Sequence, residues 1–161
     1  MASIRKANWL AFLLPTALLG GALISQYGFG LYPCEMCMWQ RWPHLAAIVL
    51  ALSALLFRSR NAALPLVVAA TMAILISGLI GGFHAGVEYD WWEGLTSCAT
   101  NLASGGDMLD SIMNAPLVRC DVAPWTLLGI SLAGFNFLFS VSGGILILMM
   151  IGKGRKEKDY V

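Results

Sequence analysis

Four long apolar runs constrain this chain more than any other feature of its sequence. They lie at about residues 9–27, 39–57, 64–83 and 125–151, and each contains 19 or more residues. A helix of 19 residues is roughly 28 Å long, close to the ~30 Å hydrocarbon core of a bilayer. The runs lack the alternating polarity of barrel strands, so only helices would satisfy their backbone in lipid. We therefore expect an all-α membrane protein, a bundle of four transmembrane helices.

The composition points to the same class. Hydrophobic residues make up 58% of the 161 residues and charged residues only 12%, whereas soluble domains carry roughly 25% charged residues. A soluble domain of this size has too little interior to bury so much apolar surface. We expect one integral membrane domain over residues 1–161, with an uncleaved first span. The net charge of +1 gives no field that would attract nucleic acid.

The basic residues predict how the bundle is oriented. Eight of the ten Lys and Arg residues flank the runs on one side, and only Arg41 and Arg119 fall on the other. By the positive-inside rule, both termini are cytoplasmic and two external loops cover about residues 28–38 and 84–123. In the second loop, Asp107 can cap a short surface helix over residues 108–113, which Pro116 would end.

All four cysteines fall in these external loops. Cys34 and Cys37 form a C-x-x-C motif in the first loop, and Cys98 and Cys120 lie in the second. An even number of cysteines on the oxidising side predicts two disulfides, and pairing within each loop is one of three connectivities. A zinc site is weakly supported by a single C-x-x-C, so we expect no metal. Haem c attachment is excluded because Met38, not His, follows Cys37.

The surroundings of Cys37 favour redox chemistry over a structural disulfide. A C-x-x-C bond closes too short a loop to stabilise the fold much. If the second helix begins near residues 39–42, its positive end lies at Cys37, and Pro43 falls in the first turn. Arg41 follows Cys37 by four residues and shares its helical face. We therefore expect a stabilised Cys37 thiolate.

Two histidines remain open to either interpretation. His44 lies one turn beyond Arg41, and His84 lies at the outer end of the third run. Each is either a histidine satisfied between helices or part of a functional site.

Two segments resemble a known family, disulfide bond formation protein B. The segment PCEMCMWQRWPH at residues 33–44 is similar to the signature of this family. Cys98, the RCD at residues 119–121 and the following PWTLLGISLAGFN at residues 124–136 are similar to its second cysteine pair and the entrance to its last helix. Four spans and two outward cysteine pairs also fit, so the resemblance covers nearly the whole chain.

The resemblance implies a thiol:quinone oxidoreductase in the bacterial inner membrane, with its redox site on the periplasmic face. Such an enzyme reoxidises a DsbA-like periplasmic thiol oxidase and passes electrons to ubiquinone or menaquinone, and so to the respiratory chain. Cys98 matches the cysteine that the partner attacks, and Cys120 its companion, which exchanges with Cys34. Cys37 then faces the quinone. Arg41 matches the arginine of the quinone site, and His84 aligns with a nearby histidine.

Two other functions are compatible with the same residues. A non-enzymatic four-span scaffold, with structural disulfides in its loops, predicts stable bonds and no bound quinone. A reductase would use the same chemistry with the electron flow reversed, and the oxidation state of the four cysteines at rest would distinguish it.

Overall fold

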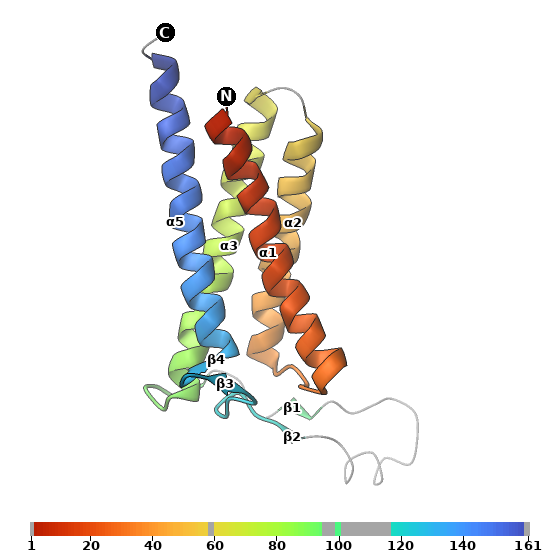
Figure 1. The fold of residues 1–161 in the computed structure, drawn as a ribbon. Helices are drawn as coiled ribbons and strands as arrows, with labels where there is room; N and C mark the ends of the chain where they lie inside the picture. The colour runs from red at the N-terminus through yellow and green to blue at the C-terminus, as the bar shows by residue number, and fades with distance from the viewer. Residues whose placement is uncertain (1, 58–59, 95–98, 101–116, 160–161) are drawn as a thin grey trace.

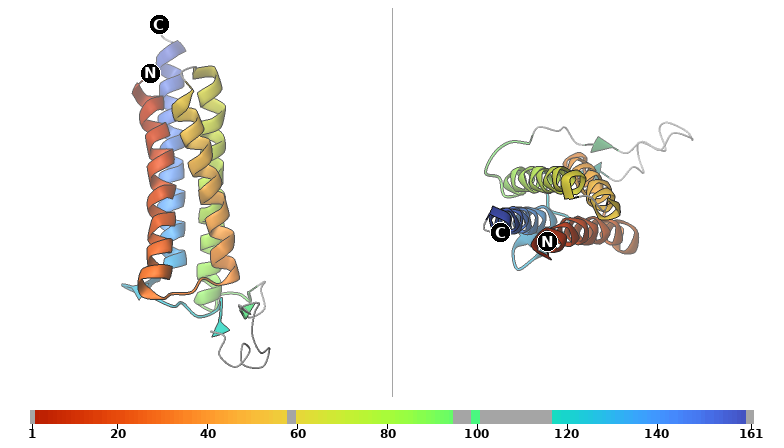
Figure 2. Two further views of the ribbon diagram at one scale, coloured as in Figure 1. Left: turned by 90° about the vertical axis from the view of Figure 1, so that its right-hand side faces the viewer. Right: turned by 90° about the horizontal axis from the view of Figure 1, so that it is seen from above.

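The computed structural model describes residues 2–57, 60–94, 99–100 and 117–159, and most of them are helical. Four long helices stand side by side (Figures 1 and 2): α1 (Ala2–Phe29), α2 (Glu35–Leu56), α3 (Arg60–Glu88) and α5 (Leu132–Asp159). The N- and C-termini lie at one end of the bundle, and the short strands lie at the other (Figure 1). The helical fold predicted from the sequence is confirmed.

Three of the described helices are long and apolar enough to cross a membrane. These candidate spans are Ile4–Phe29, Ala63–Glu88 and Leu132–Gly154. Helix α2 carries Gln40, Arg41 and His44 in its first half, which lowers its apolar content. The described residues therefore contain three candidate spans, and the fourth span expected from the sequence stays a prediction.

The helices approach one another closely because their contact faces carry small residues. Helix α3 packs against α2 and α5, and α1 packs across the same two helices. The main buried cluster contains the alanines Ala7, Ala11, Ala47, Ala51, Ala54 and Ala70. Such small side chains allow the close backbone approach that holds helices together in lipid. Large apolar side chains such as Leu13, Ile76 and Met149 are exposed on the outer faces, as suits contact with lipid tails.

Helix α2 begins earlier than the sequence indicated. Its first residue is Glu35, so Pro43 lies inside the helix and not in its first turn. Helix α3 likewise continues through His84 to Glu88, where the sequence placed the start of the second external loop. Because α2 begins early, its connection to α1 is short. The start of α2 and the end of α3 both lie close to the cysteines.

The last helix begins later than expected, because residues 126–131 form a hairpin. Strands β3 (Thr126–Leu127) and β4 (Ile130–Ser131) pair antiparallel. Leu128 and Gly129 have φ values of 53° and 78°, as a two-residue hairpin turn with positive φ at both positions requires. The predicted start of a span at residue 125 is therefore wrong, and α5 begins at Leu132.

Tyr89, the residue that follows α3, holds this hairpin in place. The Tyr89 hydroxyl donates to the Gly129 carbonyl at 2.9 Å and accepts from the Ser131 amide at 3.0 Å. The Ser131 hydroxyl in turn accepts from the Gly134 amide at 3.1 Å, which caps the first turn of α5.

A second pair of short strands lies beside the cysteines. Strand β1 (Ala99–Thr100) pairs antiparallel with β2 (Leu117–Val118), and Ala99 is the partner of Val118. The surface helix predicted at residues 108–113 lies outside the described residues.

Candidate functional site

Cys34 caps the N-terminus of α2. Its sulfur accepts a hydrogen bond from the Cys37 amide at 3.2 Å, so it satisfies one of the free amides of the first turn. The Cys34 thiol also donates to the Cys37 sulfur, with 2.8 Å between the two Sγ atoms. Cys34 is buried beside Met36 and Val87, whereas Cys37 is half-buried. The C-x-x-C spacing therefore places both sulfurs at the start of one helix.

This geometry shifts the pKa values of the two thiols in opposite directions. The hydrogen bond from Cys34 lowers the pKa of Cys37, and the Arg41 charge contributes in the same direction, while burial and the Glu88 charge oppose it. The same hydrogen bond, together with burial, raises the pKa of Cys34. The electrostatics therefore favour negative charge on Cys37 over Cys34, which is the direction expected from the sequence. The main cause is the neighbouring thiol, and Arg41 is secondary.

Arg41 is directed toward α1. Its Nη1 donates to Gln26 Oε1 at 2.6 Å, and its Nη2 donates to the Ala22 carbonyl at 3.3 Å. These two bonds fix the guanidinium between α1 and α2. The sequence placed Arg41 on the face of Cys37 but did not indicate its partners.

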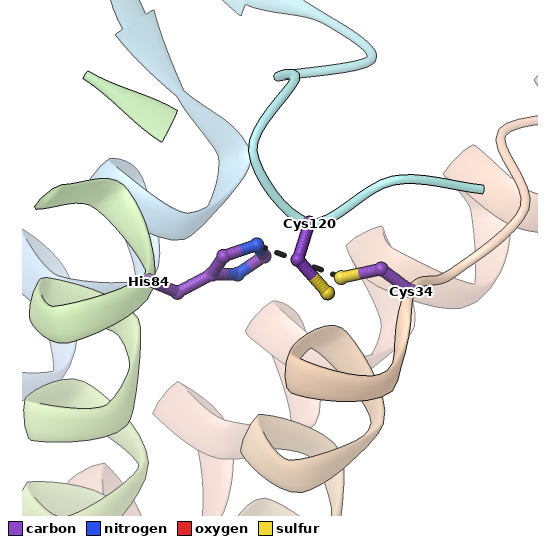
Figure 3. A group of neighbouring side chains, drawn as sticks. All are labelled: Cys34, His84 and Cys120. Carbon is purple, nitrogen blue, oxygen red and sulfur yellow. Dashed lines mark hydrogen bonds between the residues drawn. The ribbon is translucent and has the colours of Figure 1, made fainter. Parts of the chain in front are cut away.

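Cys120 comes from the segment before the hairpin and lies beside Cys34. Figure 3 shows Cys34, His84 and Cys120 converging from three separate parts of the chain. One ligand atom from each, the two Sγ atoms and a ring nitrogen, all lie within 4.8 Å of one another, and all three residues are buried. The Cys34 sulfur lies 3.5 Å from His84 Nε2. The structure thus brings together three of the predicted site residues, and Cys98 lies outside the described residues.

The same three atoms have a spacing that suits a soft metal ion. Two thiolates and an imidazole are usual zinc ligands. The expectation that this protein holds no metal therefore stays a prediction. Two thiols beside a third, at Cys37, also suit thiol–disulfide exchange, in which one sulfur attacks another in line.

A buried polar network lies under the cysteines and joins α2, α3 and α5. The Gln40 side-chain amide donates to the Met36 carbonyl at 3.1 Å and lies 2.9 Å from His84 Nδ1. The Asn136 amide donates to Gln40 Oε1 at 2.8 Å and to the Ser77 carbonyl at 3.1 Å.

On its other side, the network reaches His44. Asn136 Oδ1 lies 2.8 Å from His44 Nε2 and accepts from the Ser140 hydroxyl at 2.8 Å. Sequence reasoning did not single out Gln40 or Asn136 as site residues. The available signal was that polar side chains inside apolar runs are costly unless they are paired.

A cavity of about 250 Å³ lies beside Cys37, between α1 and the other helices. Its walls are mainly apolar, with Leu18, Leu31 and Phe135 among the lining residues, and Arg41 and His84 also contribute. An apolar cavity of about 150 Å³ holds one benzene ring, so this one has room for a substituted ring.

Two buried polar atoms at the cavity residues are unsatisfied. His44 Nδ1 and Glu88 Oε2 have no hydrogen-bond partner among the residues that the structure describes, and both residues line the cavity. The Glu88 side chain is only 2% exposed, and its Oε1 lies 3.8 Å from His84 Nε2. Buried polar atoms are usually paired, so these two atoms point to a ligand with polar groups. An apolar ring that bears oxygen atoms fits this lining, and Arg41 supplies donors for it.

Comparison with known proteins identifies the family of this chain. The family model described as "Disulfide bond formation protein DsbB" matches residues 4–150. Disulfide bond formation protein B of Verminephrobacter eiseniae is 30% identical over 93% of this chain and 87% of its own length. The protein of that name from Chromohalobacter salexigens is 33% identical, over 89% of this chain and 77% of its own length.

Another relative carries no functional name. The "Uncharacterized protein RP370" of Rickettsia prowazekii is 25% identical over 83% of this chain and 80% of its own length. No solved structure matches the chain significantly. Since the family match covers nearly the whole chain and includes the cysteine pair beside the cavity, the chain belongs to the DsbB family of membrane oxidoreductases that act in disulfide bond formation.

Proposed function

We propose that this protein is a thiol:quinone oxidoreductase. It reoxidises a DsbA-like thiol oxidase in the periplasm and passes the electron pair to a membrane quinone, ubiquinone or menaquinone, which the respiratory chain reoxidises. The observation that carries the proposal is the convergence of Cys120, Cys34 and Cys37 beside an apolar cavity. A chain of three adjacent sulfurs is what the transfer of an electron pair by successive exchange requires.

The first steps take place in the second loop. The partner's thiolate attacks Cys98 of a Cys98–Cys120 disulfide, forms a mixed disulfide and releases the Cys120 thiolate. The partner's second thiolate then breaks the mixed disulfide, so the partner leaves oxidised and Cys98 is reduced. The pairing of Ala99 with Val118 supports this route, because Ala99 directly follows Cys98 and Val118 lies two residues before Cys120.

The next step moves the electron pair to the cavity. The Cys120 thiolate attacks Cys34 of a Cys34–Cys37 disulfide, so a Cys34–Cys120 bond forms and the Cys37 thiolate is released. Charge is conserved, since one thiolate replaces another. Cys98 then attacks Cys120, which restores the outer disulfide and leaves Cys34 and Cys37 reduced.

The residues around the cavity suit the final transfer. A quinone, when bound, accepts two electrons and two protons. Two thiols give up the same two electrons and two protons when they form a disulfide. Arg41 would hold a quinone oxygen by charge-assisted hydrogen bonds, and His44 and Glu88 offer unpaired acceptors for hydroxyl groups. The apolar lining excludes water from the Cys37 sulfur.

The orientation of the protein follows from the same proposal. Both termini lie at one end of the bundle, and strand β2 lies at the other (Figure 1), where Cys34 precedes α2 and Cys120 follows β2. With the basic tail in the cytoplasm, the cysteines face the periplasm across a bacterial inner membrane, and α2 is the fourth span. Surrounding lipid would deliver the quinone to the cavity.

The test is anaerobic reduction of ubiquinone or menaquinone by the purified protein, supplied with a reduced thioredoxin-like partner. Turnover that is lost in both Cys37→Ser and Cys98→Ser supports the proposal and places each cysteine pair on the route. Absence of turnover with either quinone, while both disulfides resist the reduced partner, would favour a non-enzymatic scaffold. Cysteines that are all reduced at rest would favour a reductase.

A further inference from the structure

The orientation of two buried amides determines which ring nitrogen of His84 carries its proton. Gln40 Nε2 and Asn136 Nδ2 each lie 3.1 Å from a main-chain carbonyl, of Met36 and Ser77 respectively. A carbonyl oxygen only accepts, so both side-chain atoms must be nitrogen. The two amides are thereby fixed without reference to any histidine.

The fixed Gln40 amide then decides the state of His84. Gln40 Nε2 is a donor and lies 2.9 Å from His84 Nδ1, so Nδ1 must accept. In a cationic ring, or in the tautomer protonated at Nδ1, the Nδ1–H would face the Gln40 N–H, and two donors cannot form a hydrogen bond. His84 is consequently neutral and carries its proton at Nε2.

This proton is directed at the cysteines. His84 Nε2 lies 3.5 Å from the Cys34 sulfur. Because Nε2 already bears a proton and Nδ1 is engaged by Gln40, the ring has no lone pair available to accept a proton from a thiol. Toward a sulfur atom, His84 can therefore act only as a hydrogen-bond donor.

We propose that Gln40 and Asn136 are positioning residues that hold His84 in its Nε2–H tautomer, so that His84 stabilises negative charge on the Cys34 sulfur during exchange and is not a general base. When Cys120 attacks the Cys34–Cys37 disulfide in the proposed function, Cys34 is the sulfur at which one bond forms and another breaks. Charge is shared among the three sulfurs at that moment, and a fixed N–H donor there lowers the barrier. No proton is transferred to or from His84.

The same network determines which ring nitrogen of His44 carries the proton. Asn136 Oδ1 accepts, so His44 Nε2, 2.8 Å away, carries the proton and Nδ1 keeps its lone pair. Both rings of the chain, which has two histidines, are therefore expected in the same tautomer.

The direct test is the nitrogen NMR spectrum of the full-length protein, in detergent and labelled with 15N-histidine. Two-bond nitrogen–proton correlations show which ring nitrogen is protonated. The inference predicts Nε2–H for both rings, with His44→Phe assigning the remaining signals to His84. A His84 ring protonated at Nδ1, or at both nitrogens near neutral pH, would overturn it. This readout needs no quinone and no partner.

A kinetic test asks whether the tautomer matters to the sulfur chemistry. Reduction of the Cys34–Cys37 disulfide by dithiothreitol is measured in a background that carries Cys98→Ser and Cys120→Ser. The reagent reaches half-buried Cys37 more easily, so buried Cys34 leaves as the thiolate beside His84. Gln40→Met removes the amide, so the tautomer of His84, but not that of His44, should no longer be fixed. The reduction should then slow about tenfold.

Ser140→Ala is the matched control. It removes another hydrogen bond of the same network, but the Ser77 carbonyl still fixes the Asn136 amide. The tautomers and the reduction rate should therefore stay as in the parent protein. An equal slowing in Ser140→Ala and Gln40→Met would assign Gln40 a purely structural role and contradict the proposal. Loss of quinone turnover with the predicted tautomers intact would instead count against the proposed function alone.

Discussion

Arg41 of α2 donates a hydrogen bond to Gln26 of α1, with 2.6 Å between Nη1 and Oε1. The pair fixes a positive charge in the wall of the cavity that Cys37 also lines. A second bond, from Nη2 to the Ala22 carbonyl, means that the guanidinium is held from two directions. Only a planar group with several donors can make both bonds and still face the cavity.

We expect Arg41→Lys to raise the KM for quinone about tenfold, because lysine keeps the charge but loses the fork of donors. Initial rates at varied quinone concentration check this. Gln26→Leu should have a smaller effect, since the bond to Ala22 remains. An unchanged KM in Arg41→Lys would remove Arg41 from the quinone site.

The Cys34 thiol should control the acidity of Cys37 more than Arg41 does. The hydrogen bond from Cys34 is the largest cause that lowers the pKa of Cys37, and the Arg41 charge is a smaller one. Thiolate forms as the pH rises through the pKa, so a higher pKa moves alkylation of Cys37 to higher pH. We predict a larger upward shift in Cys34→Ala than in Arg41→Met.

The measurement is the pH dependence of the alkylation rate of Cys37, with Cys98 and Cys120 replaced by serine in every variant. The reverse order of the two shifts would show that the helix terminus and Arg41, as the sequence suggested, dominate.

Glu88 should act on Cys37 in the opposite direction. Its charge raises the pKa of Cys37, so Glu88→Gln should lower that pKa and move alkylation to lower pH. The substitution keeps the shape of the side chain, which is buried beside His84. No shift in the same alkylation experiment would mean that the Glu88 carboxyl is not ionised in the reduced protein.

Much of this site follows from the sequence alone. The C-x-x-C at the start of a helix predicts a Cys37 thiolate, and the family resemblance places Cys120 within reach of Cys34. These inferences rest on residues close in sequence, or on a family pattern. The helical class follows from the long apolar runs, because lipid leaves the backbone few alternatives.

The remaining features depend on contacts that a sequence does not show. The apolar run that was predicted to begin a span at residue 125 continues smoothly into α5, so hydrophobicity alone did not separate the hairpin at residues 126–131 from the helix. The Gln40–His84 and Gln40–Asn136 contacts join residues 44 and 96 positions apart. His44 could be assigned only when its partner Asn136 was known.

The close approach of α3 to the polar network gives a prediction about stability. A Cβ atom at Gly81 would lie 3.0 Å from each of three atoms, in Ala133, Asn136 and Gln40. Gly81→Ala should therefore destabilise the protein by about 1–3 kcal/mol, as overpacking of a core does. Thermal unfolding in detergent measures the effect.

Gly20→Ala is the control, because a Cβ there meets nothing within 4 Å. Alanine favours the helix over glycine, so this variant should be at least as stable as the parent. Equal destabilisation by both substitutions would contradict the packing seen at Gly81.

The central claim is that the electron pair passes from Cys120 through Cys34 to Cys37. The most direct measurement is acid quenching of the protein during turnover with a reduced partner and quinone, followed by mass-spectrometric mapping of its disulfides. The account predicts a Cys34–Cys120 bond that appears during turnover and is absent before the reduced partner is added. Sustained quinone reduction in which this bond never forms would contradict it.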